Sequence, residues 1–420
     1  MAENPDSTKT KRVVVTGMAA VTPFGIGVDT LWENLVNGKS GICRLSNLDA
    51  FEFPIKIGGP IPHINFEEYL PGLNVSKNDR YTNLGLMTAG MTINDAGIGP
   101  EEKDIPVIVG SGFGPVASHE ELFSIFAREG WRKIPPASIT KSMFNNLPSM
   151  ISIYHKLTGG NHGLGAACAS GTAAIGEAYQ MIKLGAERRV LAGGVDTPII
   201  PSVLGAWINM RFVLSRNPNP QAASRPFDKN RNGMVLSEGS ALILLEELES
   251  AKKRSAKIYG EIIGYGASSD AFDIAIPNSA GQALAIKRAL KDANLNPEEV
   301  DYINAHGTST PANDREETKA IKEAFGDYSY KLTVSSNKSM LGHSMGASGA
   351  IELMASILSL KNGIIPPTIN YDTPDPECDL DYVPNQARSK PIKTAISNSF
   401  AFGGNNSVIV LRRYEESDKL

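Results

Sequence analysis

An internal repeat constrains the fold of this chain more than any other feature of its sequence. Residues Asp95–Glu102 read Asp-Ala-Gly-Ile-Gly-Pro-Glu-Glu, and residues Asp292–Glu299 read Asp-Ala-Asn-Leu-Asn-Pro-Glu-Glu. Further along each copy, Ala169–Gly171 matches Ala347–Gly349, and a lysine and a glycine follow at the same spacing in both. Two matches in the same order indicate a duplicated structural unit.

In each copy a predicted helix leads into a predicted strand, Val107–Val109 in the first copy and Tyr302–Ala305 in the second. Such alternation favours parallel sheets covered by helices. We therefore expect an α/β fold built from two βαβα-type halves. The expected boundaries are a disordered tail at 1–11, an N-terminal half at 12–255, a C-terminal half at 256–413 and a short tail at 414–420.

Composition excludes several classes of protein. The net charge of −4 gives no electrostatic support for nucleic-acid binding. No apolar run approaches the roughly 20 residues that cross a bilayer, and the run Val13–Val21, interrupted at Thr16-Gly17, predicts a strand and a turn rather than a signal peptide. Three cysteines in 420 residues argue against a disulfide scaffold. We expect a cytoplasmic protein that does not associate with membranes.

Cys168 is the first candidate catalytic residue. Small residues surround it, and a helix predicted from apolar residues at helical spacing follows directly and ends at Gly185. The free N–H groups and the dipole at a helix N-terminus favour the thiolate, which is the nucleophilic form of cysteine. A buried cysteine that packs as a small apolar residue is the alternative, and the commoner one for a free cysteine.

Two of the six histidines occupy comparable positions. His306 follows the predicted strand Tyr302–Ala305, and His343 lies in a glycine-rich run at the strand-to-helix junction of the second copy. Because the repeat places these junctions at equivalent strand ends, we expect Cys168 and both imidazoles to face one another across a pseudo-twofold axis. A nucleophile with two acid/base or hydrogen-bonding groups would result.

A zinc site is the alternative for a cysteine and two histidines. The sequence has no paired ligands at short spacing, and Lys338 stands five residues before His343, where its charge opposes a cation. We therefore expect no metal. Near the C-terminus, Phe402-Gly403 follows a predicted strand and can direct a backbone N–H at a developing oxyanion, although a plain glycine turn is equally consistent with the pattern.

Five segments together resemble a known family. They are the Cys168 elbow, Ala222–Asp228, Asn304–Pro311, Lys338–His343 and Asn398–Gly404. From about Val13 to Leu411 the chain is similar to β-ketoacyl-acyl carrier protein synthases of the elongating, thiolase-fold kind, most of all to synthase II. Five motifs in one order make the resemblance specific. It implies a duplicated thiolase-like fold, a layered αβαβα sandwich whose N-terminal half carries the nucleophile and whose C-terminal half carries both histidines.

The resemblance also implies a two-stage reaction. Cys168 would accept an acyl group from an acyl carrier protein; malonyl-carrier protein would then lose CO2, and its carbanion would attack the thioester to give a β-ketoacyl product two carbons longer. His306 and His343 would hydrogen-bond the malonyl thioester carbonyl, Lys338 would orient His306, and Glu352 would hold Lys338. Two neutral imidazoles suit this chemistry, because they stabilise an enolate without protonating it.

Further roles follow from the same resemblance. The N–H groups of Cys168 and Phe402 would form the oxyanion hole, with the Phe402 ring as a gate between the half-reactions. Phe400 would bind substrate, and Thr308 and Thr310 would contact the phosphopantetheine arm. No cofactor is expected beyond the arm that the carrier protein brings, and a homodimer is implied.

Departures from the family pattern leave the substrate open. Ala166 and Asn337 stand where threonine is common, and Asn405 replaces threonine in the usual Gly-Gly-Thr-Asn loop. Phe113 occupies a glycine-rich turn that shapes the acyl tunnel in the family, and its ring is expected to restrict chain length or shape. Fatty-acid elongation, a specialised polyketide or unusual-lipid pathway, and a silent chain-length partner subunit are the three hypotheses. The presence of Cys168 with both histidines argues against the silent subunit.

A related thiolase would carry a second catalytic cysteine late in the chain, and Cys378 lies outside any match to that motif. Because carrier proteins are acidic, a basic patch is expected at the tunnel mouth. The candidates, each of which can equally be an ordinary solvated charge, are Lys77, Arg80, Arg128, Arg132, Lys133 and Arg211.

Overall fold

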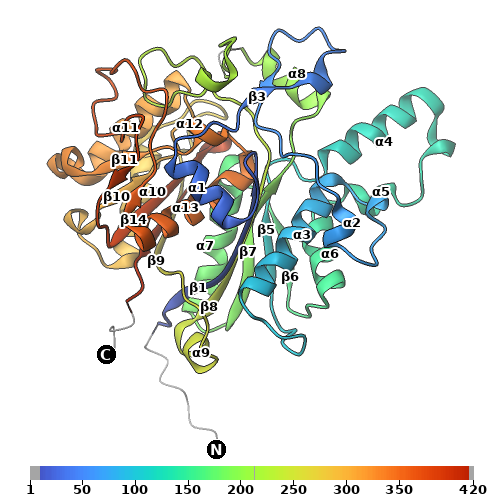
Figure 1. The fold of residues 1–420 in the computed structure, drawn as a ribbon, viewed down its shortest axis with the longest axis horizontal. Coiled ribbons are helices and arrows are strands. Elements are labelled where there is room, and N and C mark those ends of the chain that lie inside the picture. Colours follow the sequence, from blue (N-terminus) through green and yellow to red (C-terminus); the bar gives the residue numbers. More distant parts are fainter. Residues whose placement is uncertain (1–9, 212, 416–420) are drawn as a thin grey trace, which may run out of the picture.

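The computed structural model describes residues 10–211 and 213–415. A mixed sheet runs through the molecule in the strand order β11-β10-β14-β15-β9-β1-β8-β7-β5-β6, with β2 paired to β1 (Figure 1). The strands of this sheet are β1 (Val13–Thr22), β2 (Gly25–Ile26), β5 (Val107–Gly110), β6 (Asn161–Leu164), β7 (Arg189–Asp196), β8 (Gly239–Glu247), β9 (Gly260–Ser269), β10 (Tyr302–Asn304), β11 (Thr333–Ser335), β14 (Thr394–Ala401) and β15 (Asn405–Arg412). Two short hairpin-like pairs lie outside it: β3 (Cys43–Arg44) with β4 (Ile57–Gly58), and β12 (Ile364–Ile365) with β13 (Arg388–Ser389).

The two halves of the sheet have the same topology. The first half runs β6-β5-β7-β8-β1 and the second β11-β10-β14-β15-β9, so each uses its own strands in an identical order. In each half the second strand along the chain is parallel to both its neighbours. The halves join where β1 pairs antiparallel with β9. The duplication predicted from two short sequence matches therefore extends over both halves.

The repeated aspartates perform the same structural task in each half. Asp95, at the end of its helix, accepts a hydrogen bond of 2.9 Å from the backbone N–H of Met18 in β1. Asp292 accepts one of 3.0 Å from the backbone N–H of Tyr265 in β9. Each carboxylate thus ties a helix to the first strand of its half, which gives a physical reason for the sequence match.

Helices form three layers around the two halves of the sheet. The helices are α1 (Val28–Val36), α2 (Phe66–Tyr69), α3 (Arg80–Asp95), α4 (Val116–Glu129), α5 (Ser138–Ser142), α6 (Asn146–His155), α7 (Ser170–Lys183), α8 (Pro201–Asn209), α9 (Leu248–Lys253), α10 (Ser279–Ala293), α11 (Pro311–Phe325), α12 (Lys338–Leu341) and α13 (Ser348–Asn362). α7 and α13 pack on each other and contact strands of both halves, so they form the central layer. α3 and α6 cover the strands of the first half; α10 covers β9 and β15 of the second half, and α11 packs on α10.

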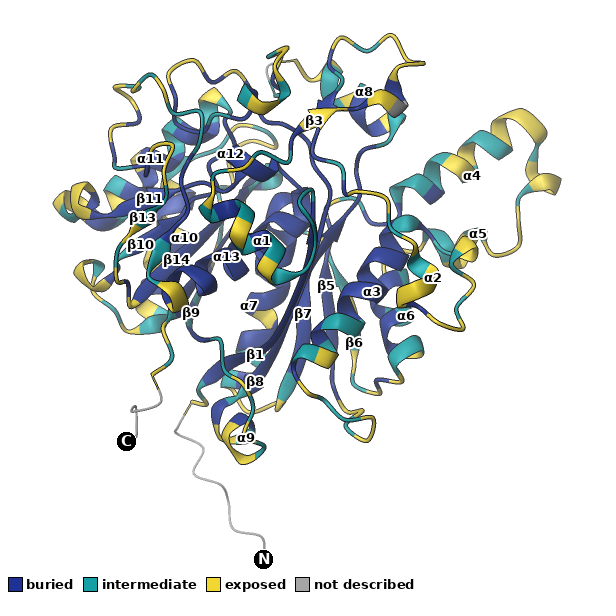
Figure 2. Cartoon of the chain, in the orientation of Figure 1, coloured by how far each residue is buried: buried dark blue, intermediate teal, exposed yellow. Residues whose placement is uncertain are grey.

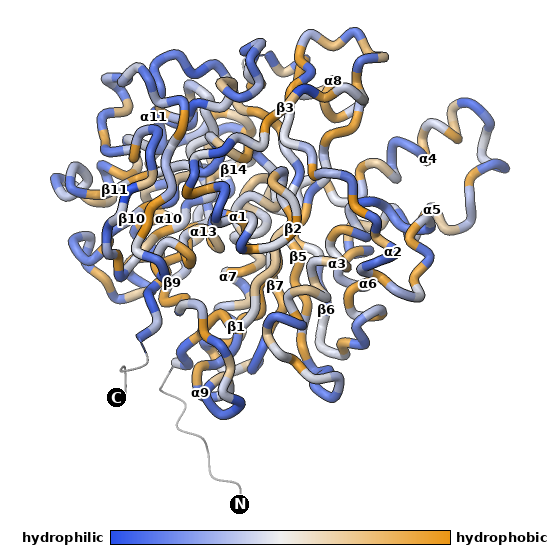
Figure 3. Tube along the Cα trace, viewed as in Figure 1, coloured by the Kyte–Doolittle hydropathy of each residue, from blue (hydrophilic) through white to orange (hydrophobic). Residues whose placement is uncertain are grey.

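This arrangement is the thiolase-like αβαβα sandwich that the resemblance implied. Figure 2 shows the central strands and the two central helices as buried, and Figure 3 shows the strongest hydrophobic colouring along the strands. α13 is buried from Ser348 to Leu360, as expected for a helix enclosed on all sides. Within the described residues, no helix combines the length and apolar character needed to cross a membrane.

The predicted turn at Thr16-Gly17 is wrong: β1 continues through it. The register against β8 shifts between Val15 and Gly17, and pairing then resumes, as at a β-bulge. A Cβ on Gly17 would lie 2.6 Å from the Cβ of Ala96. The glycine that interrupts the apolar run makes room for α3 instead of turning the chain.

One segment stands away from the layers. α4, the 3-10 turn Trp131–Lys133 and α5 form an arm that projects from the body (Figure 1). Its apolar side chains include Phe123 and Trp131, which are 64% and 67% exposed. Residues 1–9 and 416–420, which make up most of the two predicted tails, lie outside the described residues; within the first tail, the N–H of Lys11 donates to the carbonyl of Lys183.

Candidate active site

Cys168 lies in a tight elbow between β6 and α7. The residue before it, Ala167, has a φ of 47°, a left-handed conformation that a side chain rarely adopts. The hydroxyl of Ser170 accepts a hydrogen bond of 2.8 Å from the N–H of Ala166 and donates one of 2.7 Å to the carbonyl of Ala167. The strained turn is therefore held from the first residue of the helix, and it places the Cys168 side chain at the strand end.

The second half contains an equivalent elbow before α13. Met345 has a φ of 50°, and the hydroxyl of Ser348 accepts a hydrogen bond of 2.9 Å from the N–H of Ser344. Gly346 stands where the first elbow has Cys168. This second elbow follows His343 directly, so the repeat brings one candidate from each half to the same place.

Glycines allow the two elbows to approach one another. A Cβ on Gly171 would lie 2.5 Å from the carbonyl oxygen of Gly346, and a Cβ on Gly194 would lie 2.2 Å from the same atom. Backbone atoms therefore occupy the space that any larger residue would need. The close contact of α7 and β7 with the second elbow depends on these two positions.

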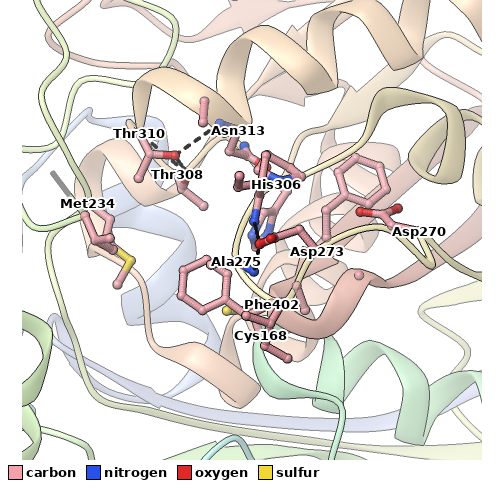
Figure 4. A pocket seen from close by; sticks show the side chains of 18 of the residues that line it. Cys168, Met234, Asp270, Asp273, Ala275, His306, Thr308, Thr310, Asn313 and Phe402 are labelled. Carbon is pink, nitrogen blue, oxygen red and sulfur yellow. Dashed lines mark hydrogen bonds between the residues drawn. The ribbon is translucent and has the colours of Figure 1, made fainter. Parts of the chain in front are cut away.

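The three predicted residues meet in one place. The sulfur of Cys168 and one ring nitrogen each of His306 and His343 all lie within 4.8 Å of one another. The two imidazole rings are 5.2 Å apart and nearly perpendicular. Figure 4 shows His306 and Cys168 at the same end of the cavity. All three residues are buried.

His343 has a defined tautomer. Its Nδ1 accepts a hydrogen bond of 3.3 Å from the N–H of Met345 and lies 2.9 Å from the hydroxyl of Ser348. The proton of a neutral ring is then on Nε2, which makes no hydrogen bond with any described residue. Burial, with a smaller effect of the Lys338 charge, lowers the pKa of His343 well below its usual value. His343 is therefore a neutral donor with a free N–H.

His306 is arranged in the same way by a buried ion pair. The ammonium of Lys338 lies 3.3 Å from Nδ1 of His306 and forms an ion pair with Glu352. Burial lowers the pKa of His306 well below its usual value, and the charge of Lys338 and the neighbouring His343 lower it further. Burial raises the pKa of Glu352 to about 7, and Lys338 opposes that shift. An ammonium at Nδ1 leaves the ring proton on Nε2, so both histidines are neutral donors.

Sequence reasoning missed the carboxylate that holds the His306 loop. Glu317 in α11 accepts hydrogen bonds of 2.8 Å from the N–H of His306 and 2.7 Å from the N–H of Gly307. Its side chain is fully buried. No motif around Glu317 marks it, because its contact with residues ten and eleven positions earlier depends on how α11 folds back.

Burial opposes the predicted preference of Cys168 for the thiolate form. Burial raises the pKa of its thiol to about 12, and the charge of Asp196 adds to that shift. Lys338 and the backbone N–H groups of Phe402 and Cys168 lower the pKa but do not outweigh desolvation. Both N–H groups thus act on the pKa of the sulfur, and the oxyanion hole that they would form stays a prediction.

Asp196, at the end of β7, was also missed. It accepts hydrogen bonds from the hydroxyl of Ser111 at 2.6 Å, from the N–H of Gly112 at 2.7 Å and from the N–H of Gly346 at 2.6 Å. Burial raises its pKa to about 6. The carboxylate thus fastens the turn before Phe113 in the first half to the elbow of the second.

A cavity of about 380 Å³ opens onto the sulfur and the imidazoles. Thr308, Thr310, Phe400 and Phe402 line it, as predicted. The hydroxyls of Thr308 and Thr310 are 2.8 Å apart, and Figure 4 shows both beside Asn313, with Phe402 next to Cys168. Apart from Phe113, the residues predicted from the sequence to bind substrate therefore line the same cavity.

Phe113 does not line this cavity. Its ring packs edge-on against Trp207 at 6.5 Å, and Trp207 packs against Phe402 at 5.7 Å. Trp207 lines the cavity and was not predicted, since nothing in the local sequence of α8 marks it. The three rings form a continuous aromatic series from the glycine-rich turn to the residue beside Cys168.

The spacing of Cys168, His306 and His343 would also suit a metal ion. The buried ammonium of Lys338 beside His306 opposes one.

The predicted basic patch is not a single surface. Arg80 forms an ion pair of 2.6 Å with Glu238. Arg128, Arg132 and Lys133 are exposed on the projecting arm, and Arg132 lies over the ring of Trp131. Of the predicted residues, only Arg211 lines the cavity; Lys77 is exposed elsewhere, in a 3-10 turn before α3.

Comparison with known proteins agrees with this geometry. The family model described as "Beta-ketoacyl synthase, N-terminal domain" matches residues 10–251, and "Beta-ketoacyl synthase, C-terminal domain" matches residues 259–372. The chain belongs to the β-ketoacyl synthase family. This synthase is therefore a transferase with ketoacyl-condensing activity.

Its relatives include a 3-oxoacyl-acyl-carrier-protein synthase and polyketide ketosynthases. It is 42% identical over 408 residues to the 3-oxoacyl-acyl-carrier-protein synthase 2 of Coxiella burnetii, covering 96% of this chain and 99% of that protein. Among solved structures, "The ishigamide ketosynthase/chain length factor" superposes with a TM-score of 0.91 at 32% identity, covering 97% of this synthase and 100% of that chain. A type II polyketide ketosynthase bound to a hexaketide, in complex with its acyl-carrier protein, superposes at 0.89 with 33% identity and the same coverage.

Proposed function

We propose that this synthase elongates fatty acyl chains by decarboxylative Claisen condensation with malonyl-acyl carrier protein. The observation that carries the proposal is the pair of neutral N–H donors on His306 and His343 beside the sulfur of Cys168. Two such donors can bind a thioester carbonyl and stabilise its enolate, whereas a charged imidazolium would protonate it.

The first half-reaction loads the enzyme. The sulfur of Cys168 forms a bond to the acyl carbon, the thioester bond to the carrier arm breaks, and the thiol proton leaves with the arm's sulfur. The N–H groups of Cys168 and Phe402 stabilise the tetrahedral oxyanion. Because burial holds the thiol protonated at rest, the arm itself serves as the final proton acceptor.

The second half-reaction extends the chain. In malonyl-carrier protein the bond to the carboxylate breaks, CO2 leaves, and the electron pair stays on the enolate that both histidines hold. The enolate carbon attacks the acyl group, the bond to Cys168 breaks, and the released thiolate takes up a proton. Lys338 and Glu352 act as positioning residues through His306, and Thr308 and Thr310 bind the arm.

A ketosynthase of a specialised polyketide or unusual-lipid pathway is the second candidate. The aromatic series Phe113, Trp207 and Phe402 favours it, because large rings beside the sulfur limit the acyl groups that fit. We further propose a homodimer formed through β6. That strand is one of the two end strands of the sheet. At the other end, Thr333 of β11 forms a bridge with Asp381. The exposed Phe144 packs over Gly163 within β6, and an edge strand is suited to pairing with a second copy.

The test uses a panel of acyl-carrier proteins carrying chains of different length, with intact-mass detection of the Cys168 adduct and then product detection after addition of malonyl-carrier protein. A saturated adduct converted to a product two carbons longer supports fatty-acid elongation. Reaction limited to short or functionalised acyl groups supports the specialised pathway. No adduct in folded protein contradicts both and favours a silent subunit. Light scattering of the purified protein tests the dimer.

A further inference from the structure

The buried carboxamide of Gln282 lines the cavity and has no hydrogen-bond partner among the described residues. Gln282 lies in the first turn and a half of α10 and is 0% exposed. Neither its Nε2 nor its Oε1 makes a hydrogen bond with any described residue, and it lines the same cavity as Cys168. Burying an amide without hydrogen bonds destabilises the fold. Such a group is therefore expected where a bound ligand supplies the missing hydrogen bonds.

A second amide side chain stands on the neighbouring strand. Asn406 in β15 is 2% exposed, and its Nδ2 donates to the carboxylate of Asp270 at 2.7 Å. That bond fixes which end of the amide is nitrogen, and its Oδ1 accepts no hydrogen bond from the described residues. Asn406 also lines the cavity, and β15 packs against α10. The wall formed by Gln282 and Asn406 therefore offers one donor and two acceptors to a ligand.

The position of Gln282 indicates which part of a substrate it meets. α10 packs on α11, and the first turn of α11, together with Thr308 and Thr310, lines the same cavity. Trp207 and Phe113 form the aromatic series beside Phe402 and belong to other elements. The helix that carries Gln282 therefore packs on the helix whose first turn lies beside the residues assigned to the carrier arm.

We propose that Gln282 is a binding residue for a secondary amide of the thioester-carrying arm, with Asn406 as a supporting acceptor. Beyond its sulfur, a phosphopantetheine arm carries two secondary amides separated by short methylene segments, and a hydroxyl follows the second amide on the pantoyl group. A carboxamide, with a donor and an acceptor at one end, is complementary to an amide N–H and C=O. The proposal rests on the proposed function, since it assumes that an acyl thioester enters here.

The test compares three hexanoyl thioesters that differ only in the leaving thiol: pantetheine with two amides, N-acetylcysteamine with one, and propanethiol with none. The acyl chain is saturated, so an oxygen on the acyl group cannot satisfy Gln282. The rate of Cys168 acylation is followed by intact mass for the wild type, for Gln282→Leu and for Gln386→Leu. Gln386 is exposed and lies outside the cavity, so it is the matched control for the same chemical change.

In Gln282→Leu we expect the preference for the pantetheine thioester over the propyl thioester to fall about fivefold to tenfold, the usual effect of one lost hydrogen bond. Its unfolding temperature should be equal to or above that of the wild type, because leucine removes an unpaired buried amide. An unchanged preference overturns the proposal, and so does an equal loss with all three donors, which indicates a structural role. If the wild type forms no adduct with any donor, the proposed function itself fails, and the assignment of Gln282 fails with it.

Discussion

The contact between the two elbows makes a quantitative prediction for Gly171→Ala. The added Cβ would lie 2.5 Å from the carbonyl oxygen of Gly346, whereas an ordinary van der Waals contact begins at 3.4 Å. α7 and the second elbow must therefore separate by about 0.9 Å, the difference between these two distances. Because Cys168 and His343 each lie three residues from this contact, the separation moves the sulfur away from the imidazole.

Two magnitudes follow for Gly171→Ala. Overpacking of this kind costs about 1–3 kcal/mol in the free energy of unfolding, which a denaturant titration measures. A displacement of about 1 Å between reacting groups lowers a catalysed rate roughly 100-fold, which the decarboxylation rate of malonyl-carrier protein measures. Gly260→Ala is the control, because its Cβ would meet neighbours only at 3.6 Å or more.

The reasoning is refuted if Gly171→Ala decarboxylates malonyl-carrier protein within about twofold of the control and unfolds at the same denaturant concentration. That result would mean that the elbows tolerate separation and that the position of Cys168 relative to His343 does not depend on their close packing. A loss of stability with full activity would contradict only the second half of the argument.

Three further outcomes are expected. Because the pKa values of His306 and His343 are lowered, the rings stay neutral, and malonyl decarboxylation should be lost only well below pH 6.5. Lys338→Met removes a charge that lowers both pKa values, so the acid limb of the pH–rate profile should move to higher pH. An acid limb that does not move contradicts the role of the Lys338 ammonium. Because the pKa of the Cys168 thiol is about 12, its alkylation by iodoacetamide should become about tenfold faster with each pH unit, up to at least pH 10. Peptide mass measures the alkylation, with Cys168→Ser as the blank. A rate that levels off near pH 8 would contradict this prediction. Phe113→Ala should broaden the range of acyl chains transferred from carrier proteins, and an identical chain-length profile would end that assignment.

Most of the fold could be predicted from the sequence because the residues that determine the fold occur twice in it. Asp95 and Asp292 recur because each fastens a helix to the first strand of its half, and Ala169–Gly171 recurs in the second elbow because both elbows need the same backbone. From that repetition the meeting of Cys168 with His306 and His343 could be anticipated. The role of Gly17 could not be predicted, because glycine is equally suited to a turn and to a bulge that packs against α3.

The remaining features depend on contacts between distant segments. Local reasoning identified backbone N–H groups that favour the thiolate of Cys168, and such groups do lower its pKa, but the larger effect of burial comes from several elements. Trp207 and Gln282 have ordinary helical surroundings in the sequence. Only the assembled cavity shows that Trp207 packs on Phe402 and that Gln282 has no hydrogen-bond partner in the part of the chain that the structure describes. Asp196 and Glu317 are likewise defined by the backbone groups that fold against them.

The second elbow has a consequence for how many acyl groups one chain can carry. It reproduces the backbone of the first, yet Gly346 offers no side chain, and its N–H is already bonded to Asp196. The duplication has therefore not produced two equivalent elbows. Under the proposed reaction, the first half would supply the sulfur that is acylated, and the second would supply the imidazoles that polarise the incoming substrate. Full loading corresponds to a stoichiometry of one acyl group per polypeptide, and neither half can turn over without the other.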